Sequence, residues 1–321
     1  MKEKFFNRED RATKIGFGEG LLATGERNPK VVAIGADITS SVGVNLFAER
    51  FPNRFISLGI AEQNCTGVAA GLALVGKIPV FSTYGVFATL RNADMIRVSI
   101  CYNNLHVIIG GAHAGVSVGP DGATHQALED IAVMRVMPNM TVLSPCDATQ
   151  TRLMTIAAIE QVRGPVYIRF GREPMPDFTS ENLPIEIGKA QIFHEGSDIS
   201  IISTGHMTWE ALQAANMLDQ LGIHPRVINL HTIKPIDEET IIRAAMETGL
   251  ILTAEEHQIT GGLGGAVAEI VSRNCPVRIE MIGMRDHFGE SGKPRELMEK
   301  YGLTASAIKQ GALNLLKTKP K

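Results

Sequence analysis

Short apolar runs rich in β-branched residues alternate along most of this chain with longer segments in which apolar residues recur every three or four positions. Runs that are apolar throughout are typical of strands buried on both faces, and the longer segments have a helical period. This alternation predicts α/β layers around largely parallel sheets. In the first half we expect strands at residues 31–34, 55–58, 78–82, 107–109, 141–143 and 166–168, and helices that include 61–75, 89–102 and 147–161.

A segment with three prolines in twelve residues, Glu173 to Pro184, interrupts the pattern. No helix or central strand is expected there. We therefore predict a first α/β domain over residues 1–175, a linker over 176–190 and a smaller α/β domain over 191–321. In the second domain we expect strands at 199–202, 226–229, 250–253 and 277–279, and helices at 208–221, 238–247, from 264 onward, and at 304–317.

The composition is typical of a two-domain enzyme in a reducing compartment. With 321 residues, 44% of them hydrophobic and 20% charged, the chain can bury more than one core. A net charge of −3 gives no basic footprint for nucleic acid or anionic membranes. The four cysteines are widely spaced without a CxxC pair, and no stretch reaches the roughly 18 apolar residues of a spanning helix. We expect a cytoplasmic protein without an export signal or membrane anchor.

Two strings concentrate polar chemistry. The first is Leu58-Gly-Ile-Ala-Glu-Gln-Asn64, which places Glu62 at the start of an otherwise apolar expected helix. Taken alone, Glu62 could simply be a first-turn acid that complements the helix dipole.

The second string is Gly119-Pro-Asp-Gly-Ala-Thr-His-Gln126. By itself a Gly-Pro-Asp-Gly run is good turn chemistry. However, His113 lies twelve residues before His125, in a glycine-rich loop after the expected strand 107–109, and α/β sheets bind ligands at such loops. A metal site formed by His113, Asp121 and His125 is disfavoured, because glycines flank them and no helical ligand pair is present.

Both strings resemble transketolases, a family of thiamine-diphosphate enzymes, and the resemblance covers nearly the whole chain. It implies a pyrimidine-binding domain followed by a transketolase C-terminal domain. Glu62 would hydrogen-bond the pyrimidine ring of thiamine diphosphate and so activate the cofactor. Asp121 and His125 would contact substrate hydroxyls near the reacting carbons, and His113 would reach toward the distal phosphate. Pro120 departs from the acidic or small residue more usual in this loop.

The resemblance extends to five further positions. Asp37 would lie beside the cofactor and Ser41 would bind a substrate phosphate, although Asp37 could also be a helix cap. Phe87 would stack on the aminopyrimidine, with a core position as the alternative. Arg172 would bind phosphate through its planar fork. Lys14 stands where the family normally has a phosphate-binding arginine, which makes an ordinary sugar phosphate a less secure substrate.

A glycine-rich run, Gly261 to Gly265, lacks the GxGxxG spacing of dinucleotide sites, so we interpret it as the start of a packed helix. The Gly-Asp-Gly motif that holds the diphosphate and its metal in this family does not occur. We therefore expect the C-terminal subunit of a split transketolase, itself without a metal ligand set. A separate N-terminal, diphosphate-binding subunit would hold Mg²⁺ or Ca²⁺. Self-association to a dimer and a heterotetramer with that partner are expected.

Other functions remain open at this point. A 1-deoxyxylulose-5-phosphate synthase-like half shares the Asp-Gly…Thr-His run, although the segment from Gln126 to Asp130 follows the transketolase pattern more closely. A β subunit of a 2-oxo-acid dehydrogenase would also activate the cofactor and have about this length. A scaffold that has lost activity is disfavoured by the intact set of Glu62, Asp121 and His125.

Overall fold

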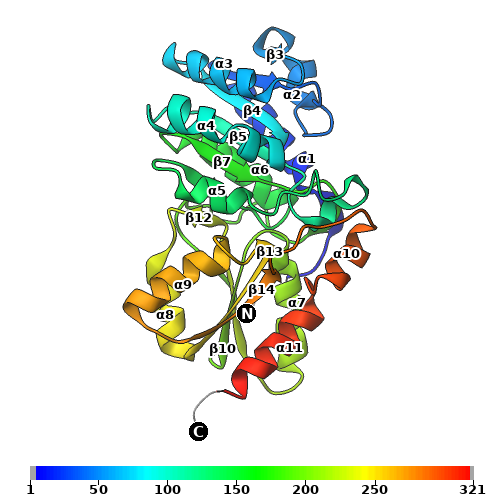
Figure 1. Ribbon diagram of the computed structural model, residues 1–321, viewed down its shortest axis with the longest axis vertical. Helices are drawn as coiled ribbons and strands as arrows, with labels where there is room; N and C mark the ends of the chain where they lie inside the picture. The colour runs from blue at the N-terminus through cyan, green and yellow to red at the C-terminus, as the bar shows by residue number, and fades with distance from the viewer. Residues whose placement is uncertain (1–4, 319–321) are drawn as a thin grey trace.

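The computed structural model describes residues 5–318 as two α/β units, one above the other along the long axis (Figure 1). The upper unit contains a seven-stranded sheet in the order β12-β6-β7-β5-β4-β2-β3. Six of its strands are mutually parallel, as the continuous apolar runs predict. These are β2 (Val31–Gly35), β3 (Phe55–Ser57), β4 (Ile78–Tyr84), β5 (Ile108–Ala112), β6 (Thr141–Leu143) and β7 (Val166–Arg169).

The seventh strand comes from the second half of the chain. Strand β12 (Thr232–Lys234) pairs antiparallel with β6 at the edge of the upper sheet. The sequence pattern did not predict this strand, which has only three residues. It ties the lower unit to the upper sheet through backbone hydrogen bonds.

Helices cover both faces of the upper sheet. The first, α1 (Thr13–Arg27), was not expected, because its four glycines weaken helix propensity. Two of them permit close packing: a Cβ on Gly16 would lie 2.0 Å from the carbonyl oxygen of Ala148, and one on Gly20 would lie 2.7 Å from that of Arg152. The other helices are α2 (Asn45–Arg50), α3 (Glu62–Leu74), α4 (Ala93–Met95), α5 (Asp130–Val136) and α6 (Ala148–Glu160).

The expected continuous helix over residues 89–102 is wrong in detail. The chain forms a π-helical turn over Phe87–Arg91, then α4 after a break at Asn92, then a second π-helical turn over Ile96–Cys101. Such turns are frequent at functional sites, and periodicity cannot distinguish them from an α-helix.

The lower unit contains a five-stranded sheet in the order β14-β13-β10-β11-β9. Helices α7 and α11 pack on one face and α8 and α9 on the other (Figure 1). The strands are β9 (Gln191–His194), β10 (Ile199–Ser203), β11 (Pro225–Asn229), β13 (Leu250–Gln258) and β14 (Arg278–Met284), and only β9 is antiparallel to its neighbour. The helices are α7 (Met207–Asp219), α8 (Glu238–Thr248), α9 (Leu263–Asn274), α10 (Pro294–Lys300) and α11 (Ala305–Leu316).

The proline-rich segment begins with a short strand. Strand β8 (Pro174–Asp177) pairs antiparallel with β1 (Glu9–Ala12) in a separate two-stranded sheet, where prolines are tolerated. Asp177 is buried and accepts hydrogen bonds from the backbone nitrogen and hydroxyl of Thr149, both at 3.0 Å. The start of the predicted linker is therefore held against the upper unit. Among the helices of residues 5–318, none has the length and apolarity needed to span a bilayer.

Candidate functional site

The predicted site residues gather at the carboxyl ends of the parallel strands of the upper sheet. This edge is where open α/β sheets bind ligands, because the loops after neighbouring strands meet there. Five connections contribute: Asp37 and Ser41 follow β2, Glu62 follows β3, Phe87 follows β4, His113 follows β5 and Arg172 follows β7.

Glu62 is the first residue of α3 and is only 3% exposed. Arg91 donates from Nη1 to both of its carboxylate oxygens at 2.9 Å. The guanidinium carbon of Arg91 also lies 4.2 Å from the centre of the Phe87 ring. The three residues therefore form one contact group. The sequence interpretation missed Arg91, which lies four residues after Phe87 in the π-helical turn.

Tyr84, at the end of β4, is the centre of a second group of contacts. Its ring lies 4.1 Å from that of His113, 5.5 Å from that of His125 and 6.0 Å from that of Phe87. The rings of Phe87 and His125 are 5.4 Å apart. The Tyr84 hydroxyl is 3.1 Å from Oγ of Ser41. The structure thus brings four predicted residues together around a tyrosine that the sequence interpretation did not single out.

Two of the predicted residues have unusual backbone conformations. Asp37 has φ 63° and His113 has φ 56°, in the left-handed region that non-glycine residues rarely adopt. Residues held in this way cluster at ligand-binding sites. His113 directly follows β5, and Asp37 lies two residues after β2, where the chain leaves the sheet.

His113 is neutral in this environment. Burial lowers the pKa of its imidazole to about 4, and the positive charges of Arg172 and Lys14 act in the same direction. Its Nδ1 atom is buried and has no hydrogen-bond partner among residues 5–318. An orphaned polar atom at a sheet edge is the kind of group that a bound ligand satisfies.

Arg172 and Asp121 form an ion pair, with Nη1 2.8 Å from Oδ1. Nε of Arg172 is also 3.4 Å from a carboxylate oxygen of Glu173. Arg169, the other arginine of this segment, is buried and bonded to Asp130 at 2.9 Å, so it is held inside the protein. Of the two arginines, Arg172 is the more exposed, with 35% of its side chain accessible against 6% for Arg169.

These residues fit the aminopyrimidine of thiamine diphosphate by their chemistry. A buried carboxylate at Glu62 offers the hydrogen-bond acceptor, and the Phe87 ring nearby offers a stacking surface. Metal ligation is a different matter: within residues 5–318, no three His, Cys, Asp or Glu side chains lie close enough together to hold a metal ion.

Two family models match the chain. The transketolase pyrimidine-binding domain matches residues 9–176, and the transketolase C-terminal domain matches residues 188–308. Among known proteins, the chain is 43% identical to the 6-deoxy-6-sulfo-D-fructose transketolase subunit SqwH of Clostridium sp. (strain MSTE9), over 91% of this chain and 90% of that one. It is 38% identical to an apulose-4-phosphate transketolase subunit of Phocaeicola vulgatus, over 95% of this chain and 98% of that one.

Solved structures agree. A split-gene transketolase, described as an inactive beta4 tetramer, superposes with a TM-score of 0.89 at 45% identity, covering 97% of this chain and all of that one. The chain is also 36% identical to 1-deoxy-D-xylulose-5-phosphate synthase of Desulforudis audaxviator, but it spans only 46% of that protein.

Proposed function

Because this chain belongs to the transketolase family and spans its pyrimidine-binding and C-terminal domains, we propose that it is one half of a two-chain transketolase. The reaction is transfer of a two-carbon ketol unit from a ketose to an aldose. The observation that carries this proposal is the convergence of Glu62, Phe87, His113 and His125 at one sheet edge. Relatives of matching length that are themselves transketolase subunits support it.

Each residue has a defined task in this proposal. Thiamine diphosphate, when bound, supplies the nucleophilic carbon that attacks the ketose. Glu62 accepts a hydrogen bond from the pyrimidine ring, and Phe87 holds the ring by stacking. His125 and Asp121 hydrogen-bond the sugar hydroxyls beside the reacting carbons, and His125 moves or holds a proton there. Asp37 lies beside the cofactor.

The opposite end of the site is suited to an anionic group. Ser41, His113, Arg172 and Lys14 offer a hydroxyl, an imidazole and two cations, and Lys14 is near enough to affect the pKa of His113. The two relatives are named for a sulfonated and a phosphorylated sugar. We therefore propose a ketose that carries an anionic group. Lys14 contributes a point charge in place of a bidentate arginine fork, which tolerates anions of different geometry.

The proposal requires a second chain. Relatives of matching length are named as transketolase subunits, which supports our assignment of the diphosphate and its Mg²⁺ or Ca²⁺ to a separate N-terminal subunit. The related split-gene protein without activity is a tetramer of one chain type, which supports self-association here. A heterotetramer with the partner is the assembly that we expect to be active. Its location in the cytoplasm stays a prediction.

Reconstitution tests the function. The purified chain is mixed with a candidate diphosphate-binding subunit, thiamine diphosphate and Mg²⁺, and ketose and aldose panels are supplied with and without pyruvate. Ketol transfer that is independent of pyruvate is the expected result. Product that requires pyruvate decarboxylation would instead indicate a 1-deoxyxylulose-5-phosphate synthase-like half. Acyl transfer to a lipoyl domain would indicate a 2-oxo-acid dehydrogenase β subunit.

A further inference from the structure

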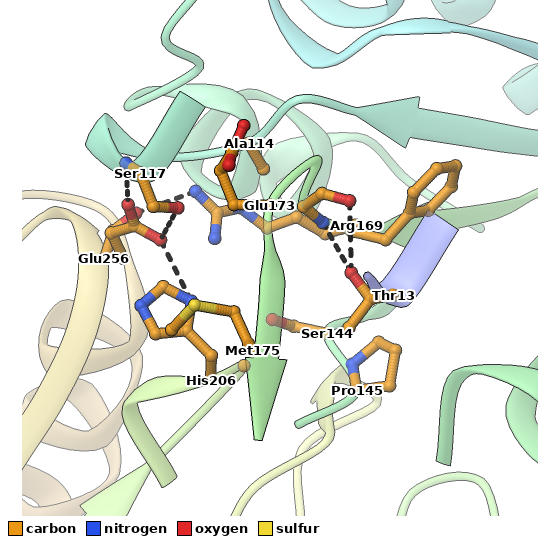
Figure 2. Close-up of a pocket in the computed structure, with 13 residues that line it drawn as sticks. Thr13, Ala114, Ser117, Ser144, Pro145, Arg169, Glu173, Met175, His206 and Glu256 are labelled. Atoms are coloured by element: carbon orange, nitrogen blue, oxygen red, sulfur yellow. Dashed lines mark hydrogen bonds and ion pairs between the residues drawn. The ribbon is translucent and has the colours of Figure 1, made fainter. Parts of the chain in front are cut away.

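One carboxylate of the lower unit is buried against a loop of the upper unit. Glu256, on β13, is 3% exposed and accepts a hydrogen bond from the backbone nitrogen of Ser117 at 2.5 Å and from its hydroxyl at 3.2 Å. Nδ1 of His206 lies 3.1 Å from the second carboxylate oxygen. Figure 2 shows Ser117 and His206 converging on Glu256 from two sides.

The contacted loop is the one that carries the proposed sugar ligands. Ser117 lies between His113 and the pair formed by Asp121 and His125. Residues 116–119 of this loop are buried, although the loop has no regular secondary structure beyond a short 3-10 turn. Hydrogen bonds within the loop join its two ends, from the backbone nitrogen of Gly115 to the carbonyl oxygen of Ala127 at 2.9 Å and from Nε2 of Gln126 to that of Val116 at 3.2 Å. Contacts from outside the loop add to these.

The lower unit provides those contacts at several points. A Cβ on Gly115, at φ 84°, would lie 2.1 Å from Cδ of Glu256, so the carboxylate occupies the space beside this glycine. Further along the loop, Gln126 donates from Nε2 to the carbonyl oxygen of Glu290 at 2.9 Å. A Cβ on Gly119 would meet Pro294 at 2.9 Å.

Burial makes the Glu256 contact specific. A buried carboxylate is costly unless donors surround it, and here the loop backbone supplies one of the donors. The neighbouring cavity, of about 20 Å³ and lined by Ser117, Arg169, His206 and Glu256, has room for little more than one water molecule.

We propose that Glu256 is a positioning residue: from the second domain it fixes the loop at Ser117 and thereby holds Asp121 and His125 in their sugar-binding geometry. The second domain, which contains none of the site residues predicted from the sequence, would then set sugar affinity. The role of the loop as a sugar ligand rests on the proposed function.

Glu255 supplies a matched control. It is the preceding residue on β13 and is also fully buried, but it accepts from the backbone nitrogens of Leu263 and Gly264 at the start of α9, at 2.7 and 2.8 Å. Its hydrogen bonds therefore stay within the lower unit. At a pH above 7, where Glu255 is ionised, Glu256→Gln and Glu255→Gln both replace a buried carboxylate with an amide, and the Glu256 change is the one that reaches the loop. Ser117→Ala removes the hydroxyl bond alone and keeps the backbone bond.

Hydrogen–deuterium exchange of the chain without cofactor, sugar or partner tests the physical claim. In Glu256→Gln, amides of residues 115–126 should exchange roughly tenfold faster, while β10 and β11 keep their native rates. Glu255→Gln should leave residues 115–126 unchanged, and Ser117→Ala should have an intermediate effect. Equal exchange in both glutamine variants, or faster exchange throughout the lower unit, would overturn the proposal.

The reconstituted complex tests the functional claim. Glu256→Gln should raise KM for the sugar roughly tenfold with little change in thiamine diphosphate affinity, because the lost contact positions sugar ligands only. An equal loss of cofactor affinity, or an unchanged KM, would reject the positioning role. If the wild-type complex has no ketol transfer, the proposed function fails, and the exchange result still decides whether Glu256 holds the loop.

Discussion

Arg91 donates from a single nitrogen to both carboxylate oxygens of Glu62, each at 2.9 Å. The carboxylate is buried, whereas the Arg91 side chain is 45% exposed, so the cation reaches in from the solvent side. An ionised carboxylate has about four acceptor positions, so Arg91 leaves room for a ligand donor. The pair holds Glu62 in place while keeping it available to the cofactor.

Glu62→Ala should abolish turnover in the reconstituted complex and leave partner binding intact. The reason is that the lost hydrogen bond activates the cofactor rather than positioning the chain. Proton exchange at C2 of the thiazolium ring, followed by NMR, measures this directly. Exchange at the native rate in the mutant complex would show that Glu62 has been misassigned.

Arg91→Met should destabilise the fold and slow the enzyme. Without Arg91, the buried carboxylate loses its charged partner, at a cost of about 1–3 kcal/mol in the free energy of unfolding. Urea denaturation measures the loss, and Arg97→Met, at an exposed position one turn and a half further on, is the control. In a double-mutant cycle, Glu62→Ala should remove most of the Arg91 effect. Additive losses would mean that the two side chains do not interact.

The largely parallel sheets and the positions of most of their strands along the chain could be expected from the sequence, because fully buried strands are apolar throughout. The same signal could not indicate α1, whose glycines are used for close packing on α6, or β12, which is too short to have a period. Similarly, the resemblance to transketolases identified Glu62, Phe87 and the two histidines as separate site residues. Tyr84 and Arg91, which connect them, became evident only when distances were known.

Acid should destabilise the protein partly through His113. Burial lowers the pKa of His113 to about 4 from 6.5, and the same holds for His231 and His257. As the pH falls, the unfolded chain binds these protons before the folded chain does. The stability that the three neutral histidines contribute is therefore complete above pH 6.5 and is lost as the pH falls toward 4. Glu255 has the opposite effect on the pH dependence of stability. Burial raises its pKa to about 7, so as the pH falls the folded chain binds this proton before the unfolded chain does.

The His113→Asn variant has no imidazole at this position, so it should lose the part of the pH dependence of stability that comes from His113. Between about pH 6.5 and 5, the stability of the variant should fall less steeply than that of the wild type, by up to about 1.4 kcal/mol per pH unit. Urea midpoints across this range provide the measurement. An identical slope in both proteins would show that His113 is not held neutral.

Arg172→Ala should chiefly raise KM for sugars with an anionic group, by roughly tenfold to a hundredfold, with little effect on kcat. Its planar fork is partly exposed and already holds Asp121 at 2.8 Å, so it can exchange that contact for a ligand anion. Matched sugars with and without phosphate separate this role from general damage. Arg163→Ala is the control, at an exposed arginine whose side chain donates to the nearby carbonyl oxygens of Glu160 and Val162. Equal losses on both sugars would remove Arg172 from the anion role.

The chain alone should bind thiamine diphosphate weakly and without dependence on Mg²⁺. In residues 5–318, no three His, Cys, Asp or Glu side chains are close enough together to bind a metal ion. In our proposal, Glu62 and Phe87 contact the pyrimidine end of the cofactor and not its diphosphate. The charged diphosphate would then lack the cation that neutralises it. Calorimetry with thiamine diphosphate, with and without Mg²⁺, should show Mg²⁺-dependent binding only after the partner subunit is added. Tight, Mg²⁺-dependent binding by the chain alone would reject the division of the site between two subunits.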